Sequence, residues 1–181
     1  MSHVVLLRGV NVGGHRTFRP AQLAAKLRHL GAVNIGAAGT FVIRRPTSRA
    51  RLRAEFARRL PFDTHVMICS GRDVAAVLSN NCFAGIPARP DIVRFVSVLS
   101  RASRSAPTLP MQFPARGPWM LKVLDCDRQF VFGVYRRHMK AIGRLGSLDR
   151  VFGSAATTRN WNTFTAIAKA LAGGTSTSKR P

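Results

Sequence analysis

The stretch Val4-Val5-Leu6-Leu7-Arg8-Gly9-Val10-Asn11-Val12-Gly13-Gly14 decides how the chain begins to fold. Its first four residues are apolar and β-prone, which predicts a buried strand that ends at Gly9. A glycine-rich turn follows. From Pro20 onward, leucines recur at helical spacing until Gly31, which is typical of an amphipathic helix and its end. The sequence therefore predicts the order strand, turn, helix for residues 4–31.

The same alternation of strands and helices continues along the rest of the chain. Apolar runs and helical spacings predict strands at residues 39–44, 64–69, 92–99, 119–124 and 129–135, and helices at 49–60, 74–80, within 138–151 and at 162–172. The two halves of the chain read alike. We therefore predict an α+β fold with two similar ferredoxin-like subdomains, each an antiparallel sheet with helices packed on one face.

A stretch rich in proline and glycine, residues 83–91, is the best candidate for a linker. It divides the chain into a predicted N-terminal subdomain at residues 1–88 and a C-terminal subdomain at 89–172. The remaining residues, 173–181, are small and polar, which predicts a disordered tail.

The composition is that of a folded and strongly basic protein. The 181 residues are 46% hydrophobic, and 29 Lys and Arg against 7 Asp and Glu give a formal net charge of +22. The positive charge is spread over both halves and is mostly arginine. Such a field attracts polyanions, so nucleic acid or another polyanion is the predicted partner. A bias in codon usage toward arginine is the alternative explanation.

Several classes of protein are disfavoured by what the sequence lacks. No apolar run approaches the roughly 20 residues of a membrane helix, and the N-terminus does not resemble a secretory signal, so we expect a cytoplasmic protein without a membrane partner. Cys69, Cys82 and Cys126 are widely spaced, and the histidines show no ligand spacing, so neither a metal nor another cofactor is predicted. No nucleophile motif assigns a catalytic residue, and the sequence leaves open whether the protein is an enzyme.

The turn at residues 11–14 is the first candidate site. Glycines permit a positive φ and allow a ligand to approach the backbone, and amides at the start of a helix can hold an anion. The alternative is a glycine-rich bend that serves only the fold.

The run Thr157-Thr158-Arg159-Asn160-Trp161-Asn162-Thr163, just before the last predicted helix, is the second candidate site. It combines hydroxyls, amides, a guanidinium and an indole, which can bind and stack on a planar or anionic ligand. The alternative is structural, with Asn160 or Asn162 as a helix cap and Trp161 as a buried anchor.

Aromatic residues in the strand at 129–135 form a third pattern. Phe130, Phe132 and Tyr135, followed by Arg136 and Arg137, are typical of sheets that stack RNA bases. Phe130 and Phe132 share one face while Tyr135 lies on the other, so core packing is the favoured interpretation.

Two of these segments together resemble a known family. Residues 6–14 and 156–163 are similar, in order and separation, to the two signatures of the bacterial family called domain of unknown function 1697. The resemblance extends over about residues 3–172. It implies an α+β fold with two similar subdomains but no activity. It also marks motif positions which, together with Trp161, form the predicted ligand-binding set: Arg8, Asn11, Gly13, Gly14, Arg159, Asn160 and Trp161.

Three hypotheses about function follow. The leading one is a cytosolic protein that binds nucleic acid or another phosphate-bearing ligand through its basic surface. The alternative is a small-molecule enzyme whose site lies between the subdomains, with the turn at 11–14 facing the run at 159–162. In the third, both motifs are structural and the protein acts through an unidentified partner.

Overall fold

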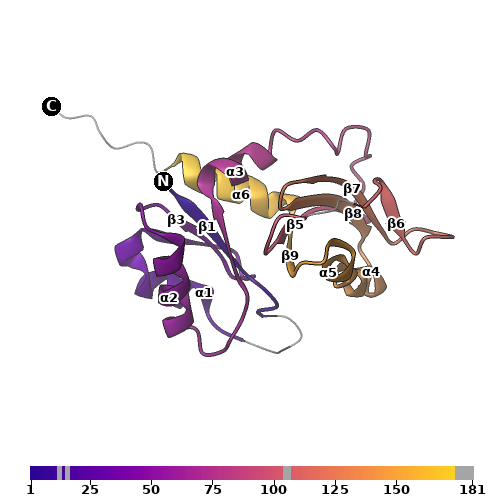
Figure 1. The fold of residues 1–181 in the computed structure, drawn as a ribbon. Coiled ribbons are helices and arrows are strands. Elements are labelled where there is room, and N and C mark those ends of the chain that lie inside the picture. The colour runs from indigo at the N-terminus through magenta and orange to yellow at the C-terminus, as the bar shows by residue number, and fades with distance from the viewer. Residues whose placement is uncertain (12–13, 15–16, 104–106, 174–181) are drawn as a thin grey trace. The chain divides into compact units, whose positions relative to one another are not determined.

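The computed structural model describes residues 1–11, 14, 17–103 and 107–173 (Figure 1). The chain forms two compact units, of which the first contains Met1–Leu78 and the residues from Thr163 onward, and the second contains Ser79–Asn162. The predicted boundary after residue 88 thus lies within the second unit, and the last helix groups with the first. Apart from Gly173, the predicted tail lies outside the described residues.

The first unit is a four-stranded antiparallel sheet with helices. Its elements are β1 (His3–Leu7), α1 (Pro20–Lys26), a 3₁₀ turn η1 (Arg28–Leu30), β2 (Ala32–Ile35), β3 (Thr40–Ile43), α2 (Arg49–Arg59), β4 (Val66–Ser70) and α3 (Gly71–Val77). All but the first two residues of α6 (Trp161–Ala172) also belong to this unit. The strand order is β2-β3-β1-β4. The element order βαββαβ with this sheet order is the ferredoxin-like arrangement.

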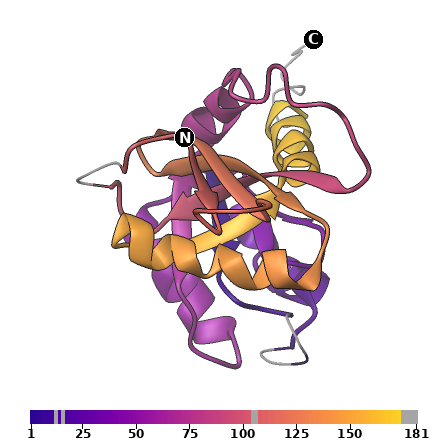
Figure 2. The same ribbon diagram turned by 90° about the vertical axis from the view of Figure 1, so that its right-hand side faces the viewer.

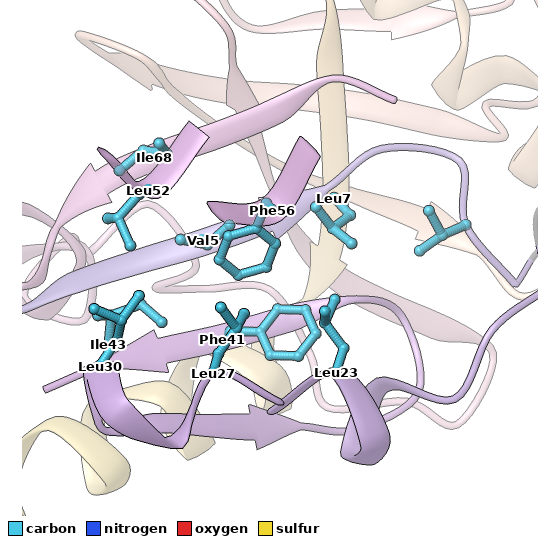
Figure 3. Close-up of a cluster of buried hydrophobic side chains, with 11 residues drawn as sticks. Val5, Leu7, Leu23, Leu27, Leu30, Phe41, Ile43, Leu52, Phe56 and Ile68 are labelled. Atoms are coloured by element: carbon cyan, nitrogen blue, oxygen red, sulfur yellow. The ribbon is translucent and has the colours of Figure 1, made fainter. Parts of the chain in front are cut away.

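The core of the first unit lies between its sheet and the helices α1 and α2 (Figure 3). Leu27, just after α1, and Phe56 of α2 are fully buried against Val5 and Phe41 of the sheet. The rings of Phe41 and Phe56 meet edge to face, with 5.3 Å between their centroids. The helical spacing of apolar residues in the sequence therefore marks the helix faces that cover this sheet.

Glu55 of α2 lies at the centre of a charged cluster that also includes a histidine of η1. Its carboxylate is 2.6 Å from Arg59 Nη1, 2.9 Å from Arg58 Nη2 and 3.2 Å from His29 Nε2. Desolvation favours the neutral acid, but the charges of Arg59, Arg58 and His29 outweigh it and lower the pKa of Glu55 below its ordinary value. The carboxylate therefore favours the folded state when it is ionised.

We expect the Glu55→Gln variant to be less stable than the wild type at pH 7 and to approach it in acid. Because the folded pKa is depressed, the contribution of Glu55 is complete above the unfolded value of about 4.3 and is lost as the pH falls through the lower folded value. Urea unfolding of both proteins from pH 7 to pH 3 measures the difference. A free-energy difference that stays constant over this range contradicts the prediction.

The second unit is a five-stranded antiparallel sheet of order β6-β7-β8-β5-β9. Its elements are β5 (Ile92–Leu99), β6 (Met111–Phe113), β7 (Leu121–Asp127), β8 (Phe130–Arg136), α4 (Met139–Leu145), α5 (Ser147–Phe152) and β9 (Ala156–Asn160). Without β6, the order β7-β8-β5-β9 repeats β2-β3-β1-β4 of the first unit. In the first unit, α1 lies between β1 and β2. Between the matching strands β5 and β7 of the second unit, the described part of residues 100–118 forms no helix and one short edge strand, β6. The predicted α+β class, with two similar antiparallel subdomains, is confirmed.

Helices α4 and α5 lie along one face of this second sheet (Figures 1 and 2). Leu148 and Phe152 of α5 pack with Phe95 of β5 in the core of the unit. Phe130 and Phe132 are 3% and 1% exposed, so these aromatic side chains serve packing and not base stacking. In the part of the chain that the structure describes, no helix has the length and apolar character needed to cross a bilayer.

Candidate ligand-binding site

The turn after β1 belongs to the first unit, and the side chain of Asn11 in this turn makes hydrogen bonds within the fold. Asn11 has φ 55°. Its Nδ2 donates to the Ala37 carbonyl at 2.8 Å, and its Oδ1 accepts the Phe18 N–H at 2.9 Å. Gly14 is exposed with φ +76°, and Gly13 lies outside the described residues. Asn11 therefore ties together three stretches of backbone.

Arg8 lies at the end of β1 and is partly buried. Its N–H donates to the His65 carbonyl at 3.1 Å, and its carbonyl accepts a hydrogen bond from Thr64 Oγ1. The backbone of Arg8 thus continues the pairing of β1 with the segment that leads into β4.

The second motif spans the end of β9 and the start of α6, and β9 is an edge strand of the second sheet that the sequence analysis did not predict. Val96 of β5 lies opposite Arg159 in the ladder. Arg159 is only 7% exposed, and its Nη1 donates to Thr157 Oγ1 and to the Thr158 carbonyl, both at 2.8 Å. Burial lowers the pKa of its guanidinium to about 10, so the side chain stays protonated at pH 7. Arg159 is therefore an internal cation of the second unit.

A pocket of about 450 Å³ opens where β9 passes into α6. This volume lies within the range of about 300–1,000 Å³ that small-molecule sites occupy. Two predicted site residues, Asn160 and Trp161, line it. The other lining residues come from the segment before β5, from β5 itself, from the residue after β8 and from the start of α6: Pro87, Ala88, Arg89, Pro90, Ile92, Val93, Arg94, Arg137 and Asn162.

Aromatic contacts hold the indole of the pocket in place. The rings of Trp161 and Phe83 meet edge to face, with 5.0 Å between their centroids. The guanidinium carbon of Arg94 lies 5.7 Å from the Phe83 centroid, and Arg94 Nη2 donates to the Ile86 carbonyl at 2.8 Å. Phe83 is 7% exposed. Phe83, at the start of the segment predicted as a linker, is therefore packed, whereas Pro87–Pro90 of the same segment are exposed where they line the pocket.

Asp91 organises the cations beside the pocket. Its carboxylate accepts from Arg89 Nε at 2.9 Å and also from Arg136 Nη1. The hydrogen bond from Arg89, followed by that from Arg136, lowers the pKa of Asp91 below its ordinary value, although desolvation opposes the shift. The Arg137 N–H donates to the Asp91 carbonyl at 2.8 Å, and its side chain is exposed. An arginine carries five N–H donors, so Arg89 and Arg136 keep further donors for a ligand.

The structure thus brings together part of the predicted set. Asn160 and Trp161 line one pocket, and Arg159 lies buried next to them in β9. The predicted ligand-binding set lacks Arg89, Arg94 and Arg137 of the pocket. The first two lie in or beside a stretch that resembles a linker, and Arg137 follows the aromatic strand for which core packing is the favoured interpretation. Among the described residues, no group of three His, Cys, Asp or Glu side chains could hold a metal ion.

Arg8, Asn11 and Gly14 belong to the first unit, whereas Asn160 and Trp161 belong to the second. The alternative hypothesis of an enzyme requires these two segments to face each other across the two units. It stays a prediction.

The first signature and the part of the pocket wall before and within β5 fall in a region shared with other proteins. A family model described as "Protein of unknown function (DUF1697)" matches residues 1–112. This chain belongs to the DUF1697 family. The matched region contains the turn after β1 and the pocket residues 87–94, and it ends before β9.

A solved structure supports the fold of this DUF1697 protein. The conserved bacterial protein SP0830 from Streptococcus pneumoniae is 19% identical, and the alignment covers 94% of this chain and 98% of that one with a TM-score of 0.55. At this identity the likeness establishes the fold alone. No curated protein matches the chain. Neither the family description nor the name of the Streptococcus protein specifies a ligand or a reaction.

Proposed function

We propose that this DUF1697 protein is a cytoplasmic binding protein for nucleic acid or another phosphate-bearing ligand, which it holds in the pocket at the start of α6. One observation carries the proposal. Trp161 lines the same pocket of about 450 Å³ as three arginines, Arg89, Arg94 and Arg137.

The chemistry of these groups fits a ligand that is both anionic and planar. Guanidinium groups bind phosphate through two parallel N–H donors, and the side-chain amides of Asn160 and Asn162 add donors and acceptors. An indole that stacks on a base contributes about 1–3 kcal/mol. The N-terminal end of α6, at Trp161, adds partial positive charge from the helix dipole.

The pocket and the net charge contribute differently to binding. A formal charge of +22 attracts any polyanion, and this attraction weakens steeply as salt rises. Stacking on Trp161 depends little on salt. A ligand held in the pocket should therefore keep part of its affinity at physiological salt, whereas a ligand held only by the charge should not.

We expect the Trp161→Leu variant to bind labelled single-stranded oligonucleotides about 5- to 150-fold more weakly than the wild type, because a stacking contact is lost. The Arg137→Ala variant should lower the slope of log affinity against log salt by about 0.7, the value for one phosphate contact to a single strand. Fluorescence anisotropy across a salt series, with heparin as a competitor, measures both.

The control is Arg51→Ala, which removes an equal charge from an exposed position on α2 of the first unit. It should leave the affinity at physiological salt nearly unchanged. Equal losses in Trp161→Leu, Arg137→Ala and Arg51→Ala would mean that the protein attracts polyanions through its overall charge and that the pocket binds nothing.

A further inference from the structure

The two tryptophans of the chain lie at the same end of the second sheet. Trp119 precedes β7, and Trp161 follows β9. The ladders pair the start of β7 with the end of β8, and the end of β8 with the start of β5, whose first half pairs with the end of β9. Three strand spacings separate β7 from β9, which amounts to about 14 Å.

A continuous line of contacts connects Trp119 with the pocket. The Arg136 guanidinium carbon lies 4.6 Å from the ring centroid of Trp119, and Lys122 Nζ lies 5.0 Å from it. Arg136 also pairs with Asp91, which in turn holds Arg89 of the pocket wall.

Positive charge dominates this line. Its cations are Arg89, Arg94, Lys122, Arg136 and Arg137, and the carboxylate of Asp91 lies among them. The pocket at Trp161 has the volume of a small-molecule site, so it accommodates a single nucleotide-sized group. Trp119 precedes β7, about three strand spacings from β9, so its indole is too far away to stack on that same group.

We infer that the ligand is a single-stranded nucleic acid longer than one nucleotide, with one base at Trp161 and its backbone passing Arg137 and Arg136 toward Trp119. This inference rests on the proposed function and names its ligand. A single strand fits because aromatic side chains stack on unpaired bases, which a duplex keeps within its own stack.

A length series from a nucleoside monophosphate to a hexanucleotide tests the inference, with tryptophan fluorescence as the readout. The Trp119→Phe variant leaves Trp161 as the reporter, and Trp161→Phe leaves Trp119. We expect the monophosphate to quench Trp161 alone. Longer single strands should quench both tryptophans and bind at least ~5-fold more tightly, as one further stacked base provides.

The matched variants are Lys122→Ala, beside Trp119, and Lys140→Ala, exposed on α4. Lys122→Ala should weaken the binding of the hexanucleotide but not that of the monophosphate. Lys140→Ala should change neither affinity. Affinity that does not rise with length, with Trp119 unresponsive, overturns the inference but leaves the pocket intact. Failure of every probe to quench Trp161 overturns the proposed function itself. Tighter binding of the matching duplex than of the single strand also overturns the inference.

Discussion

Gly133→Ala is expected to lower the free energy of unfolding by about 3 kcal/mol, the upper part of the range for overpacked cores. Gly133 lies in β8, opposite Phe95 of β5 and Val123 of β7. A methyl group there would lie 2.3 Å from the Lys122 carbonyl oxygen and 2.5 Å from Phe95 Cζ. Neither neighbour can move easily, because Lys122 lies within strand β7 and the Phe95 side chain is fully buried.

The matched control is Gly143→Ala in α4, where a methyl group meets nothing within 4 Å. Alanine favours a helix over glycine, so this variant should gain about 0.5–1 kcal/mol. Urea unfolding followed by circular dichroism compares the two variants with the wild type. If the free energy of unfolding changed by a similar amount and in the same direction in both variants, the neighbours of Gly133 would have room for a methyl group, which contradicts the prediction.

Phe56→Ala is expected to cost about 3–5 kcal/mol, the usual loss for a phenylalanine removed from a core. The Phe56 side chain is fully buried and contacts the ring of Phe41. The surrounding sheet and helices cannot close the space that a ring leaves, so a cavity adds to the lost burial. The loss of unfolding free energy is measured by urea titration.

Phe62→Ala deletes the same ring at a partly buried position beside Phe18, where the ring centroids are 5.8 Å apart. Because solvent can fill the space it leaves, this variant should lose clearly less than Phe56→Ala. Equal losses would contradict the placement of Phe56 in the core of the first unit.

The elements predicted correctly are those whose apolar pattern is strong on its own. The run at β1 and the helical spacing of Leu52 and Phe56 in α2 identify buried faces without any knowledge of the neighbours. The missed strands β2, β6 and β9 lack such a pattern. In β9, Thr157 and Arg159 are buried polar residues, and the strand exists because the edge of β5 offers it hydrogen bonds.

The segment before β5 shows the same limit. Its glycine and prolines are typical of a linker, but Phe83 is buried against Phe132 and Trp161. The residues around Phe83 in the sequence do not predict its contacts with Phe132 and Trp161, because both lie far from it along the chain. The last helix, likewise, follows β9 of the second unit in sequence but groups with the first unit.

The sequence by itself determined the α+β class, the repeated order of strands and helices, the strong positive charge and the membership of the DUF1697 family, whose model matches residues 1–112. Each depends on composition or on short-range spacing, which the chain carries without folding. Only the tertiary structure decided that Arg159 is buried while Trp161 lines a pocket with Arg89, Arg94 and Arg137. Those side chains come from strands and loops that meet only when β8, β5 and β9 pair, and strand pairing over such distances leaves no periodic trace in the sequence.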